Sequence, residues 1–307
     1  MALKVLFVGR EKENKNVSPI IINQAKSLIE KGVEVDIYPI KGPYLKNFFP
    51  LKKTIKKNQY NIIHAHYSLS GILTALSTKK PVVVSLMGAF NKKNLRYVVV
   101  RFFIKYMWAK TIVKSESAAK NLRNKKTIVL PNGLDIKQFA HLNKQILRQK
   151  LNFMPERKYI VFVANPDRTI KNYPLAREAV SLLGNSTELL TVYNKQHTDA
   201  LEYMAAADAL ILTSLSEGSP NVIKEALACR LPIVSTKVGD VEWLLDNVEG
   251  CFVASSYNAP EIAGLLKQAL SFEKPTNGRE KLLSLNLDSE SVANKLIDIY
   301  KTVLYGK

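Results

Sequence analysis

Two glutamates, Glu217 and Glu225, carry the clearest chemical signal in the sequence because of the residues between them. Glu217 lies in a loop after the apolar run DALILTS, and Glu225 lies inside a helix predicted to start at Pro220. Proline in a first helical turn lacks only an amide hydrogen that would be unpaired there. The remaining N–H groups and the helix dipole favour an anionic or hydroxyl-rich ligand. The first carboxylate can accept hydrogen bonds from sugar hydroxyls, and the second can reach the two hydroxyls of a ribose.

A second pair, Arg168 and Lys171, lies three residues apart in the loop after a predicted strand. A departing nucleoside diphosphate develops negative charge, and fixed cations stabilise that charge without a metal ion. Many nucleotide-sugar enzymes instead hold Mg²⁺ or Mn²⁺ with an Asp-x-Asp pair, and this sequence contains no Asp-x-Asp. The pattern therefore predicts a diphosphate site without a bound metal. A pair of ordinary surface cations is the alternative.

Three further segments bring polar groups or glycines to the ends of predicted strands. The segment HAHY ends one strand, and His66, or less favourably His64, is expected to contact an acceptor or support proton transfer. A structural role is the alternative for such a histidine. Gly88 ends the next strand and is expected to line the acceptor pocket. Asn132 and Gly133 are expected to form a tight turn facing a cleft, with a purely structural turn as the alternative.

The elements that must position these groups alternate between strand and helix. The predicted strands cover residues 3–9, 33–40, 60–66, 81–88, 110–115, 126–133, 158–165, 187–194, 208–214 and 231–236. Such alternation is typical of parallel, doubly wound sheets, and the polar segment at 140–157 separates two of them. We therefore predict an α/β fold with two Rossmann-like domains, 1–140 and 141–288, facing across a cleft that binds ligands. A C-terminal helix at 289–307 is expected to pack back on the N-terminal domain.

The segment SEGSPNVIKEALACRLPIVSTKVGDVEWL at 216–244 resembles the E-x7-E signature of the retaining GT-B glycosyltransferases, most closely family 4 (group 1). The resemblance implies that Glu217 and the loop amides hold the donor sugar and that Glu225 holds the nucleotide ribose. The loop residues assigned to the substrate in this way are Gly218, Ser219, Pro220, Asn221 and Val222. The resemblance also implies that Arg168 and Lys171 contact the donor diphosphate. The segment LPNGLDIKQF, with Asn132 and Gly133, resembles the P-N-G-[VL]-D element of the same family.

The resemblance is tight over residues 126–245, looser over 60–90 and faint before them. Many relatives carry a Gly-Gly loop after the first strand, where this chain has the polar segment GREKENKNVSP. Many also place a His or Asp after the strand where this chain has LMGAF. These differences leave the acceptor and the proton-handling residue open.

The resemblance implies a retaining, hexosyltransferase-type enzyme that moves a sugar from a UDP- or GDP-type nucleotide sugar to a lipid-linked or growing glycan acceptor. Its expected setting is cell-surface polysaccharide synthesis, with a glycan or glycolipid as acceptor and with no cofactor and no metal. Two alternatives stay open, namely a nucleotide-sugar epimerase of related fold and a basic nucleic-acid-binding protein. No recognisable RNA- or DNA-binding motif is present, so a nucleic-acid partner is not expected.

The net charge of +19 is concentrated in the first half of the chain. Residues 1–150 hold 29 Lys and Arg against 7 Asp and Glu, whereas the remainder holds 16 against 19. Such asymmetry indicates an anionic partner (a membrane surface, a phosphorylated acceptor or nucleic acid), with a lysine-rich proteome as the alternative. Residues 92–110 mix basic with aromatic side chains, which suits a helix on an anionic membrane surface. A core helix with a basic outer face fits that segment equally well.

The two cysteines, Cys229 and Cys251, lack the spacing of a metal site and favour a reduced setting. The first residues, MALKVLFVGRE, are expected to form a strand rather than a signal peptide. No apolar run approaches the roughly 18 residues that cross a bilayer. We therefore expect a cytoplasmic protein, with peripheral attachment to the inner face of the cell membrane as a further expectation.

Overall fold

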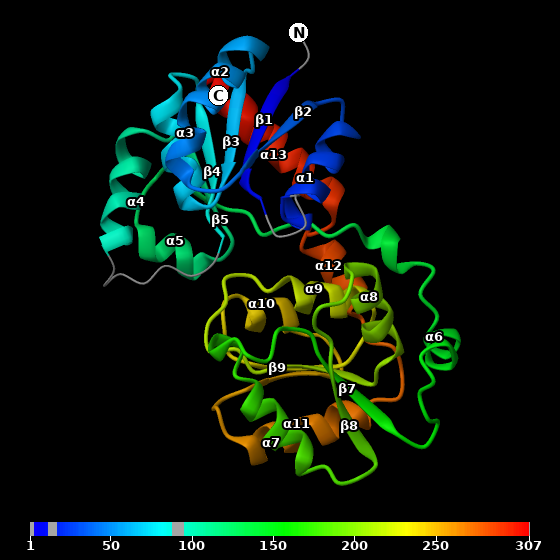
Figure 1. Ribbon diagram of the computed structural model, residues 1–307. Helices are drawn as coiled ribbons and strands as arrows, with labels where there is room; N and C mark the ends of the chain where they lie inside the picture. Colours follow the sequence, from blue (N-terminus) through cyan, green and yellow to red (C-terminus); the bar gives the residue numbers. More distant parts are fainter. Residues whose placement is uncertain (1–2, 12–16, 88–94, 307) are drawn as a thin grey trace. The chain divides into compact units, whose positions relative to one another are not determined.

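The computed structural model describes residues 3–11, 17–87 and 95–306, and the chain divides into two compact units (Figure 1). Unit 1 comprises Met1–Gly133 together with Leu287–Lys307, and unit 2 comprises Leu134–Asn286. The first change of unit falls after Gly133, earlier in the chain than residue 140. The chain returns to unit 1 at Leu287, so its last helix, α13 (Ser289–Tyr305), belongs to the same unit as its first strand.

Unit 1 is built on a six-stranded parallel sheet with the strand order β2-β1-β3-β4-β5-β6. The strands are β1 (Lys4–Arg10), β2 (Glu34–Ile40), β3 (Ile62–His66), β4 (Val82–Ser85), β5 (Lys110–Val113) and β6 (Thr127–Val129). The helices before α13 are α1 (Pro19–Ile29), the 3₁₀ helix η1 (Tyr44–Asn47), α2 (Phe48–Asn58), α3 (Ser68–Ser77), α4 (Leu95–Tyr106) and α5 (Glu116–Leu122). The strand order reverses between β1 and β3, which is the topological switch point of this sheet.

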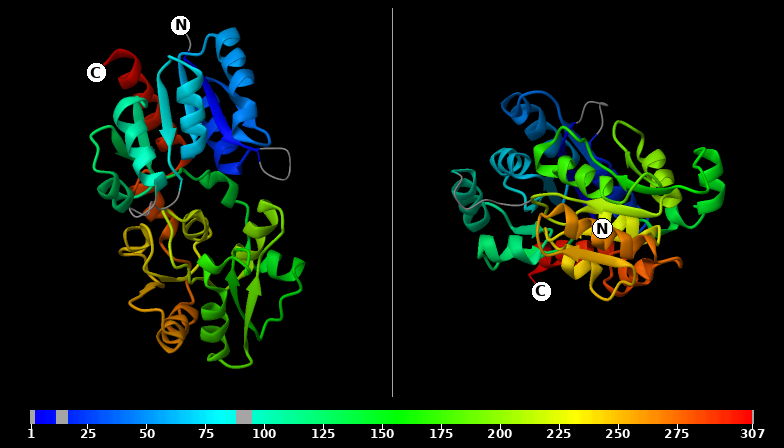
Figure 2. Two further views of the ribbon diagram at one scale, coloured as in Figure 1. Left: turned by 60° about the vertical axis from the view of Figure 1, so that its left-hand side comes forward. Right: turned by 90° about the horizontal axis from the view of Figure 1, so that it is seen from below.

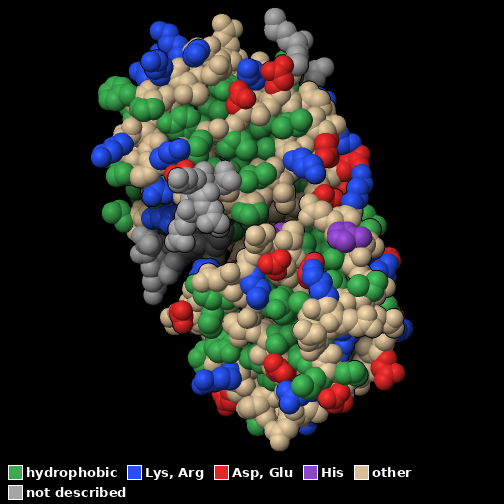
Figure 3. All heavy atoms as spheres, turned by 45° about the vertical axis from the view of Figure 1, so that its right-hand side comes forward, with side chains coloured by type: hydrophobic (Ala, Val, Ile, Leu, Met, Phe, Trp, Pro, Cys, Tyr) green, Lys and Arg blue, Asp and Glu red, His purple; other side chains and the backbone are tan. Residues whose placement is uncertain are grey.

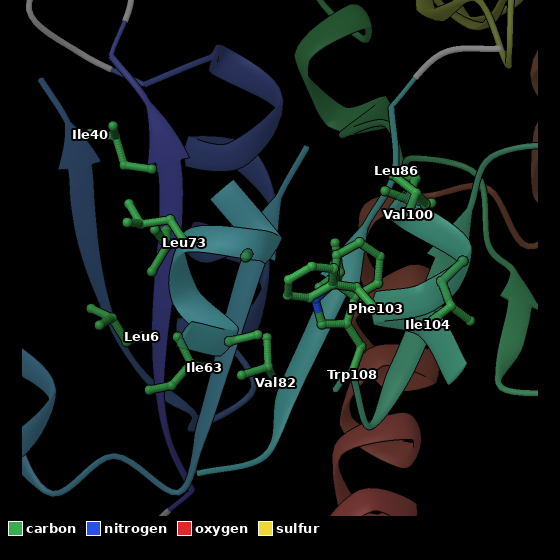
Figure 4. Close-up of a cluster of buried hydrophobic side chains, with 14 of the residues drawn as sticks. Leu6, Ile40, Ile63, Leu73, Val82, Leu86, Val100, Phe103, Ile104 and Trp108 are labelled. Atoms are coloured by element: carbon green, nitrogen blue, oxygen red, sulfur yellow. The ribbon is translucent and has the colours of Figure 1, made fainter. Parts of the chain in front are cut away.

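Alternate residues along each strand of unit 1 enter two separate cores, as the two-residue period of a strand requires. Leu6 and Val8 of β1 pack with α2, α3, α4 and α5 on one face, where Phe103 and Trp108 also lie (Figure 4). The intervening Phe7 packs on the other face. That face is covered by α1 and α13, although the two helices lie more than 250 residues apart in the chain (Figure 2).

Unit 2 repeats this architecture with a five-stranded parallel sheet in the order β11-β10-β9-β7-β8. The strands are β7 (Lys158–Phe162), β8 (Thr187–Thr191), β9 (Ala209–Leu212), β10 (Ile233–Thr236) and β11 (Cys251–Ala254). The helices are η2 (Ile136–Phe139), α6 (Lys144–Lys150), η3 (Thr169–Lys171), α7 (Tyr173–Ser181), α8 (His197–Ala206), α9 (Asn221–Ala228), α10 (Val241–Leu245), α11 (Ala259–Leu270) and α12 (Gly278–Ser284). The switch point of this sheet lies between β7 and β9.

The core of unit 2 lies on both sides of this second sheet. α7 and α11 pack on one face, and α8, α9 and α10 lie on the other (Figure 1). The prediction of an α/β fold with two Rossmann-like domains is confirmed. Strand β11, with the sequence CFVA, was not among the predicted strands.

Candidate active site

The residues singled out in unit 2 lie in the loops that follow β7 and β9, at the carboxyl edge of the sheet and at its switch point. The loop after β7 carries Arg168 and ends in the short helix η3 with Lys171. The loop after β9 carries Glu217 and leads into α9. Since β7 and β9 are hydrogen-bonded neighbours, their following loops emerge side by side. In open α/β sheets this is the place where ligands bind.

Lys171 and Glu217 contact each other directly. Lys171 Nζ donates to Glu217 Oε1 at 2.6 Å, and Ser214 Oγ donates to the same oxygen at 2.9 Å. Both charged side chains are largely shielded, with exposed fractions of 16% and 18%. A charge-assisted hydrogen bond in such a setting is stronger than one at an open surface. The contact therefore fixes the position of a cation beside a carboxylate.

Backbone contacts tie the same two loops together. The hydroxyl of Thr213 donates to the carbonyl oxygens of Lys171 and Asn172, at 3.0 and 2.9 Å. The amide of Leu215 donates to the carbonyl of Ile170 at 2.8 Å. Arg168 lies immediately before η3 in the first of these loops, and its side chain is exposed. Its guanidinium forms no ion pair with the carboxylates of residues 3–11, 17–87 and 95–306. In this loop, Lys171 is thus held by its ion pair with Glu217, whereas Arg168 is exposed and available to a ligand.

Helix α9 begins at Asn221, and its preceding residue, Pro220, provides no side-chain cap. The first amides of a helix have no intrahelical partner, so they are available to an anion or to sugar oxygens. The carbonyl of Pro220 accepts a bond from Ile223 N at 3.2 Å, which closes the first turn. Gly218 and Ser219 lie in the loop just before this helix start, and Val222 is the second residue of the helix.

Glu225 lies one turn into α9 and is paired with a histidine that the sequence did not reveal. Glu225 Oε1 is 2.9 Å from Nε2 of His197, the first residue of α8. The hydrogen bond from Glu225 raises the pKa of His197 above 6.5 and outweighs desolvation, which acts in the opposite sense. Its partner Glu225 lies 28 residues further along the sequence, so no local pattern predicts that His197 belongs to this site.

A second unpredicted pair lies beneath the same loop. Lys224, the neighbour of Glu225, is only 1% exposed, and burial lowers its pKa to about 8. Burial raises the pKa of Asp240 to about 6, while Ser219 and Lys224 act to lower it. Lys224 and Asp240 therefore interact electrostatically inside unit 2, each displaced toward its neutral form. The signal in the sequence is a lysine at an otherwise apolar position of a helix, which is easily taken for a surface residue.

The loop that carries Asp240 also touches the loop that carries Glu217. Gly239 has φ of +58°, and a Cβ atom at this position would lie 2.4 Å from the carbonyl oxygen of Gly218. No side chain larger than hydrogen fits there unless one of the two loops moves. The backbone of residues 217–220 is therefore braced from below by residues 238–240.

In unit 1, His66 lies inside the sheet rather than at an open edge. Its ring is fully buried, and Nε2 is 3.0 Å from Gln24 Oε1 of α1. Burial and the charge of Lys114 lower the pKa of His66 to about 3. A base with so low a pKa is poorly matched to proton transfer near neutral pH. The proposed contact of His66 with an acceptor stays a prediction.

His64 lies beside His66 and joins β3 to the C-terminal helix. Its Nδ1 is 2.6 Å from the hydroxyl of Tyr300 in α13, and its Nε2 is 2.9 Å from Ser85 Oγ in β4. The two imidazole rings are stacked with centroids 4.5 Å apart. Because desolvation lowers the pKa of His64 well below 6.5, the ring is neutral and its contacts are those of a packed core.

The remaining predicted positions of unit 1 have different outcomes. Asn132 is buried, and a Cβ at Gly133 would lie 3.0 Å from the backbone of Asp288 and Ser289. The expected tight turn at these residues is wrong, because residues 131–133 run without a turn alongside the start of α13. Gly88 lies outside the described residues. Contact of Asn132, Gly133 or Gly88 with a ligand stays a prediction.

Within the described parts of the chain, no group of three or more His, Cys, Asp and Glu side chains is arranged to hold a metal ion. Across the same residues, every helix is too short or too polar to span a bilayer.

Two family models match the chain. The model described as glycosyl transferases group 1 matches residues 161–271, which include Arg168, Lys171, Glu217 and Glu225. The model described as glycosyltransferase family 4 matches residues 25–138.

The chain is also similar to individual proteins. A teichuronic acid biosynthesis glycosyltransferase of Bacillus subtilis, TuaC, is 28% identical over 62% of this chain, and the match spans 57% of TuaC. The UDP-Gal:α-D-GlcNAc-diphosphoundecaprenol α-1,3-galactosyltransferase of Escherichia coli is 23% identical over 84% of this chain and 76% of its own length. The crystal structure of Anabaena HepE in complex with UDP covers 98% of this chain and 100% of its own, with a TM-score of 0.77 and 17% identity. The likeness to HepE concerns the fold.

Proposed function

The chain belongs to the group 1, family 4 glycosyltransferases of the GT-B type, and we propose that it transfers a sugar from a nucleotide diphosphate sugar to a lipid-linked glycan acceptor. The observation that carries the proposal is the meeting of Lys171 with Glu217 beside the start of α9, at the switch point of unit 2. A cation, a carboxylate and free helix amides are the groups that a charged, hydroxyl-rich donor needs.

The donor diphosphate is proposed to bind to Arg168, Lys171 and the first amides of α9. Lys171 Nζ has three hydrogens, of which one is directed to Glu217, so two are left for phosphate oxygens. Arg168 is exposed in the same loop and can present its planar fork to a phosphate. As the bond to the sugar breaks, negative charge grows on the departing diphosphate. Groups already fixed around that charge stabilise it without reorganising.

The two glutamates are proposed to hold the two sugar rings of the donor. Glu217 is beside the cation, so it would accept hydrogen bonds from hydroxyls of the transferred hexose. Glu225 lies one turn along α9 and would accept from the ribose hydroxyls. The proposed transfer retains the configuration at the anomeric carbon and needs no metal, because Arg168 and Lys171 supply the positive charge.

The experiment is a transfer or donor-hydrolysis assay with UDP- and GDP-sugars, run with and without EDTA. We expect turnover of one nucleotide class, unchanged by EDTA, with NMR of the product showing the anomeric configuration of the donor. Glu225→Ala and Arg168→Ala should abolish it. Full activity in either variant would remove the site assignment, and loss of activity in EDTA would remove the metal-independent mechanism.

A lipid-linked acceptor requires access to a membrane surface, and unit 1 has one surface suited to it. The helices α2, α3 and α4 pack side by side on one face of the sheet and contain no Asp or Glu. Their exposed large apolar residues, with those of η1, are Leu45, Phe49, Leu69, Leu76, Leu95, Val98, Val99, Phe102 and Tyr106. Their Lys and Arg residues are Lys52, Lys53, Lys56, Lys57, Arg96, Arg101 and Lys105. We call this set the basic–apolar face.

The spacing on α4 is that of an amphipathic helix with its apolar stripe turned outward. Leu95, Val98, Phe102 and Tyr106 follow one another at three or four residues, and all are more than half exposed. Phe103 and Trp108, two of the aromatic residues in the segment 92–110, are core residues. Lys92 and Lys93 of that segment lie outside the described residues. Figure 3 shows part of unit 1, with Lys and Arg side chains among hydrophobic ones.

This combination is proposed to bind an anionic bilayer peripherally, on the cytoplasmic side. Exposed apolar side chains insert into the headgroup region, and each nearby Lys or Arg adds about 1 kcal/mol of attraction to an anionic surface. A glycan or glycolipid acceptor held in that bilayer would then be presented to unit 1. The growth of a cell-surface polysaccharide is the proposed setting.

A further inference from the structure

The pairing of His197 with Glu225 connects two segments that leave the sheet of unit 2 on opposite sides of β7. His197 opens α8, which follows β8, whereas Glu225 belongs to α9, which follows β9. The contact of 2.9 Å uses only Oε1 of the carboxylate. Oε2 makes no hydrogen bond to another residue in the described parts of the chain. One oxygen is thus held by protein, and the other is left for a ligand.

We propose that His197 is a positioning residue for the donor: it holds Glu225 so that the carboxylate meets the ribose hydroxyls, and it adds a positive charge that is present only when its ring is protonated. The inference rests on the proposed function, because it assigns a ribose to Glu225. Neither part of this role is assigned to His197 by the pattern of the sequence.

The protonation state of the His197 ring depends mainly on its contact with Glu225. A protonated ring at the first position of α8 is disfavoured by the helix dipole. The hydrogen bond to Glu225 nevertheless raises the pKa of His197 above 6.5, because it outweighs the desolvation of the ring. The ring therefore gains its second proton more readily than a free histidine does. A bound diphosphate would add negative charge nearby and act in the same direction.

Other charged groups around α8 are engaged elsewhere. In α6, which packs against α8, Lys150 pairs with Glu202 at 2.6 Å and Arg148 pairs with Asp208 at 3.0 Å. On the segment of His197 itself, Lys195 lies 5.1 Å from the ring centroid of Tyr203, and Asp199 is exposed in the first turn of α8. In α9, Lys224 is buried next to Glu225 and interacts with Asp240. Glu225 is the carboxylate that pairs with His197.

His197 is proposed to act through its hydrogen bond to Glu225 and through its charge, and two variants separate these effects. His197→Ala removes both the hydrogen bond and the charge. His197→Gln keeps an amide donor for Glu225 but cannot be protonated. Orientation of Glu225 should therefore survive in the glutamine variant and fail in the alanine variant, whereas the pH-dependent charge should be lost in both.

The test measures dissociation constants for UDP, GDP and their 2′,3′-dideoxy forms at pH 6, 7 and 8 by calorimetry, on the full chain. In the wild type, removing the ribose hydroxyls should weaken binding about tenfold or more, as loss of a hydrogen bond to a charged group does. In His197→Ala this penalty should shrink to about twofold or less, and in His197→Gln it should persist. Wild-type binding should also weaken about threefold or more from pH 6 to 8, as attraction to the diphosphate is lost. Neither variant should show this change.

These measurements distinguish a failure of the proposed His197 role from a failure of the proposed donor binding. If the wild type binds neither UDP nor GDP, the proposed function fails and takes the inference with it. If the wild type binds and His197→Ala keeps both the full ribose penalty and the pH dependence, the role of His197 is overturned while donor binding stands. Thermal unfolding of both variants checks that they fold. A folded His197→Gln that behaves as the alanine variant in the ribose comparison would also contradict the positioning role.

Discussion

Lys171 Nζ and Glu217 Oε1 are 2.6 Å apart, although the two residues are separated by 46 positions in the sequence. The pair joins the loop after β7 to the loop after β9 and places opposite charges together where a donor would bring both phosphates and hydroxyls. A pair of this kind is more than a surface salt bridge, because each partner has a proposed contact of its own with the ligand. Changing either partner should therefore affect ligand binding and turnover in different ways.

Lys171→Ala should lower kcat by about 10²-fold, because a fixed donor to the developing diphosphate charge is removed. Glu217→Gln should instead raise KM for the nucleotide sugar more than it raises the inhibition constant of the competitor UDP or GDP, because only the sugar contacts Glu217. Steady-state kinetics with inhibition by the free nucleotide measures both. Lys267→Ala, an exposed cation on α11, is the control and should leave all constants unchanged. Equal loss of nucleotide and nucleotide-sugar affinity in Glu217→Gln would speak against a sugar contact.

Acid should destabilise unit 1 through His66. The pKa of this buried ring is about 3, below its value of 6.5 in an unfolded chain. Below pH 6.5 the unfolded chain binds a proton that the folded unit does not, so stability falls as pH falls from 6.5 toward 3. Between pH 7 and 5 we expect a loss of about 2 kcal/mol from this residue. Urea unfolding followed by Trp108 fluorescence, in a Trp243→Phe background, reports on unit 1.

The variant for this measurement is His66→Gln, which cannot titrate. Its difference in unfolding free energy between pH 7 and 5 should be about 2 kcal/mol smaller than that of the wild type. An unchanged difference would mean that His66 is accessible to protons in the folded unit. That result would restore its candidacy for proton transfer.

Lys171, Glu217 and His66 all lie at or after the ends of predicted strands, but their surroundings in the folded chain differ. Lys171 and Glu217 were both predicted as site residues because each follows an apolar strand and stands in a motif with local chemistry. His66 also ends a strand, but it is buried on the face of the sheet that α1 and α13 cover, and α13 lies more than 200 residues further along the chain. Local patterns predict which residues stand at the ends of strands. They do not predict which of those ends a distant helix will close.

The basic–apolar face should bind anionic vesicles in a salt-dependent manner. Phe102→Ser on α4 and the pair Lys52→Glu with Lys56→Glu on α2 should each weaken binding, through lost insertion and through reversed charge respectively. Sedimentation with vesicles of phosphatidylglycerol and phosphatidylcholine, at 50 and 500 mM salt, measures the effect. Raising the salt shortens the reach of the attraction and should release the protein.

The control for this face is Lys295→Glu with Lys301→Glu. Both lysines are exposed on α13, which covers the opposite face of the same sheet, so the net charge changes equally. This variant should bind vesicles nearly as the wild type does. If the control and the α2 variant lose binding alike, total charge rather than the basic–apolar face is responsible. If light scattering shows a dimer that Phe102→Ser abolishes, a second copy of the chain rather than a membrane covers the basic–apolar face.

Lys224 and Asp240 should show strong coupling in a double-mutant cycle. Lys224→Met leaves a buried carboxylate without its compensating charge and should cost about 3–5 kcal/mol. Replacing both residues, with Lys224→Met and Asp240→Asn, should cost less than the sum of the single changes, since no buried charge is then left alone. Urea unfolding followed by Trp243, which lies in α10 close to Asp240 in sequence, measures unit 2. Additive effects would mean that the two charges act independently.

Gly239 should be irreplaceable for donor binding rather than for stability alone. Alanine at φ of +58° is strained by about 1–2 kcal/mol, and its Cβ would also press on the carbonyl of Gly218 at 2.4 Å. Gly184 has φ of +86° with nothing within 4 Å of an added Cβ, so Gly184→Ala carries the strain without the clash. Gly239→Ala should lose more stability than Gly184→Ala, and only Gly239→Ala should weaken UDP or GDP binding, by about tenfold or more, because the loop of Glu217 and the start of α9 must shift. Calorimetric titration beside thermal unfolding separates the two effects. If Gly239→Ala binds nucleotide as tightly as Gly184→Ala does, residues 238–240 do not brace the donor loop, and its geometry is set from within residues 213–220.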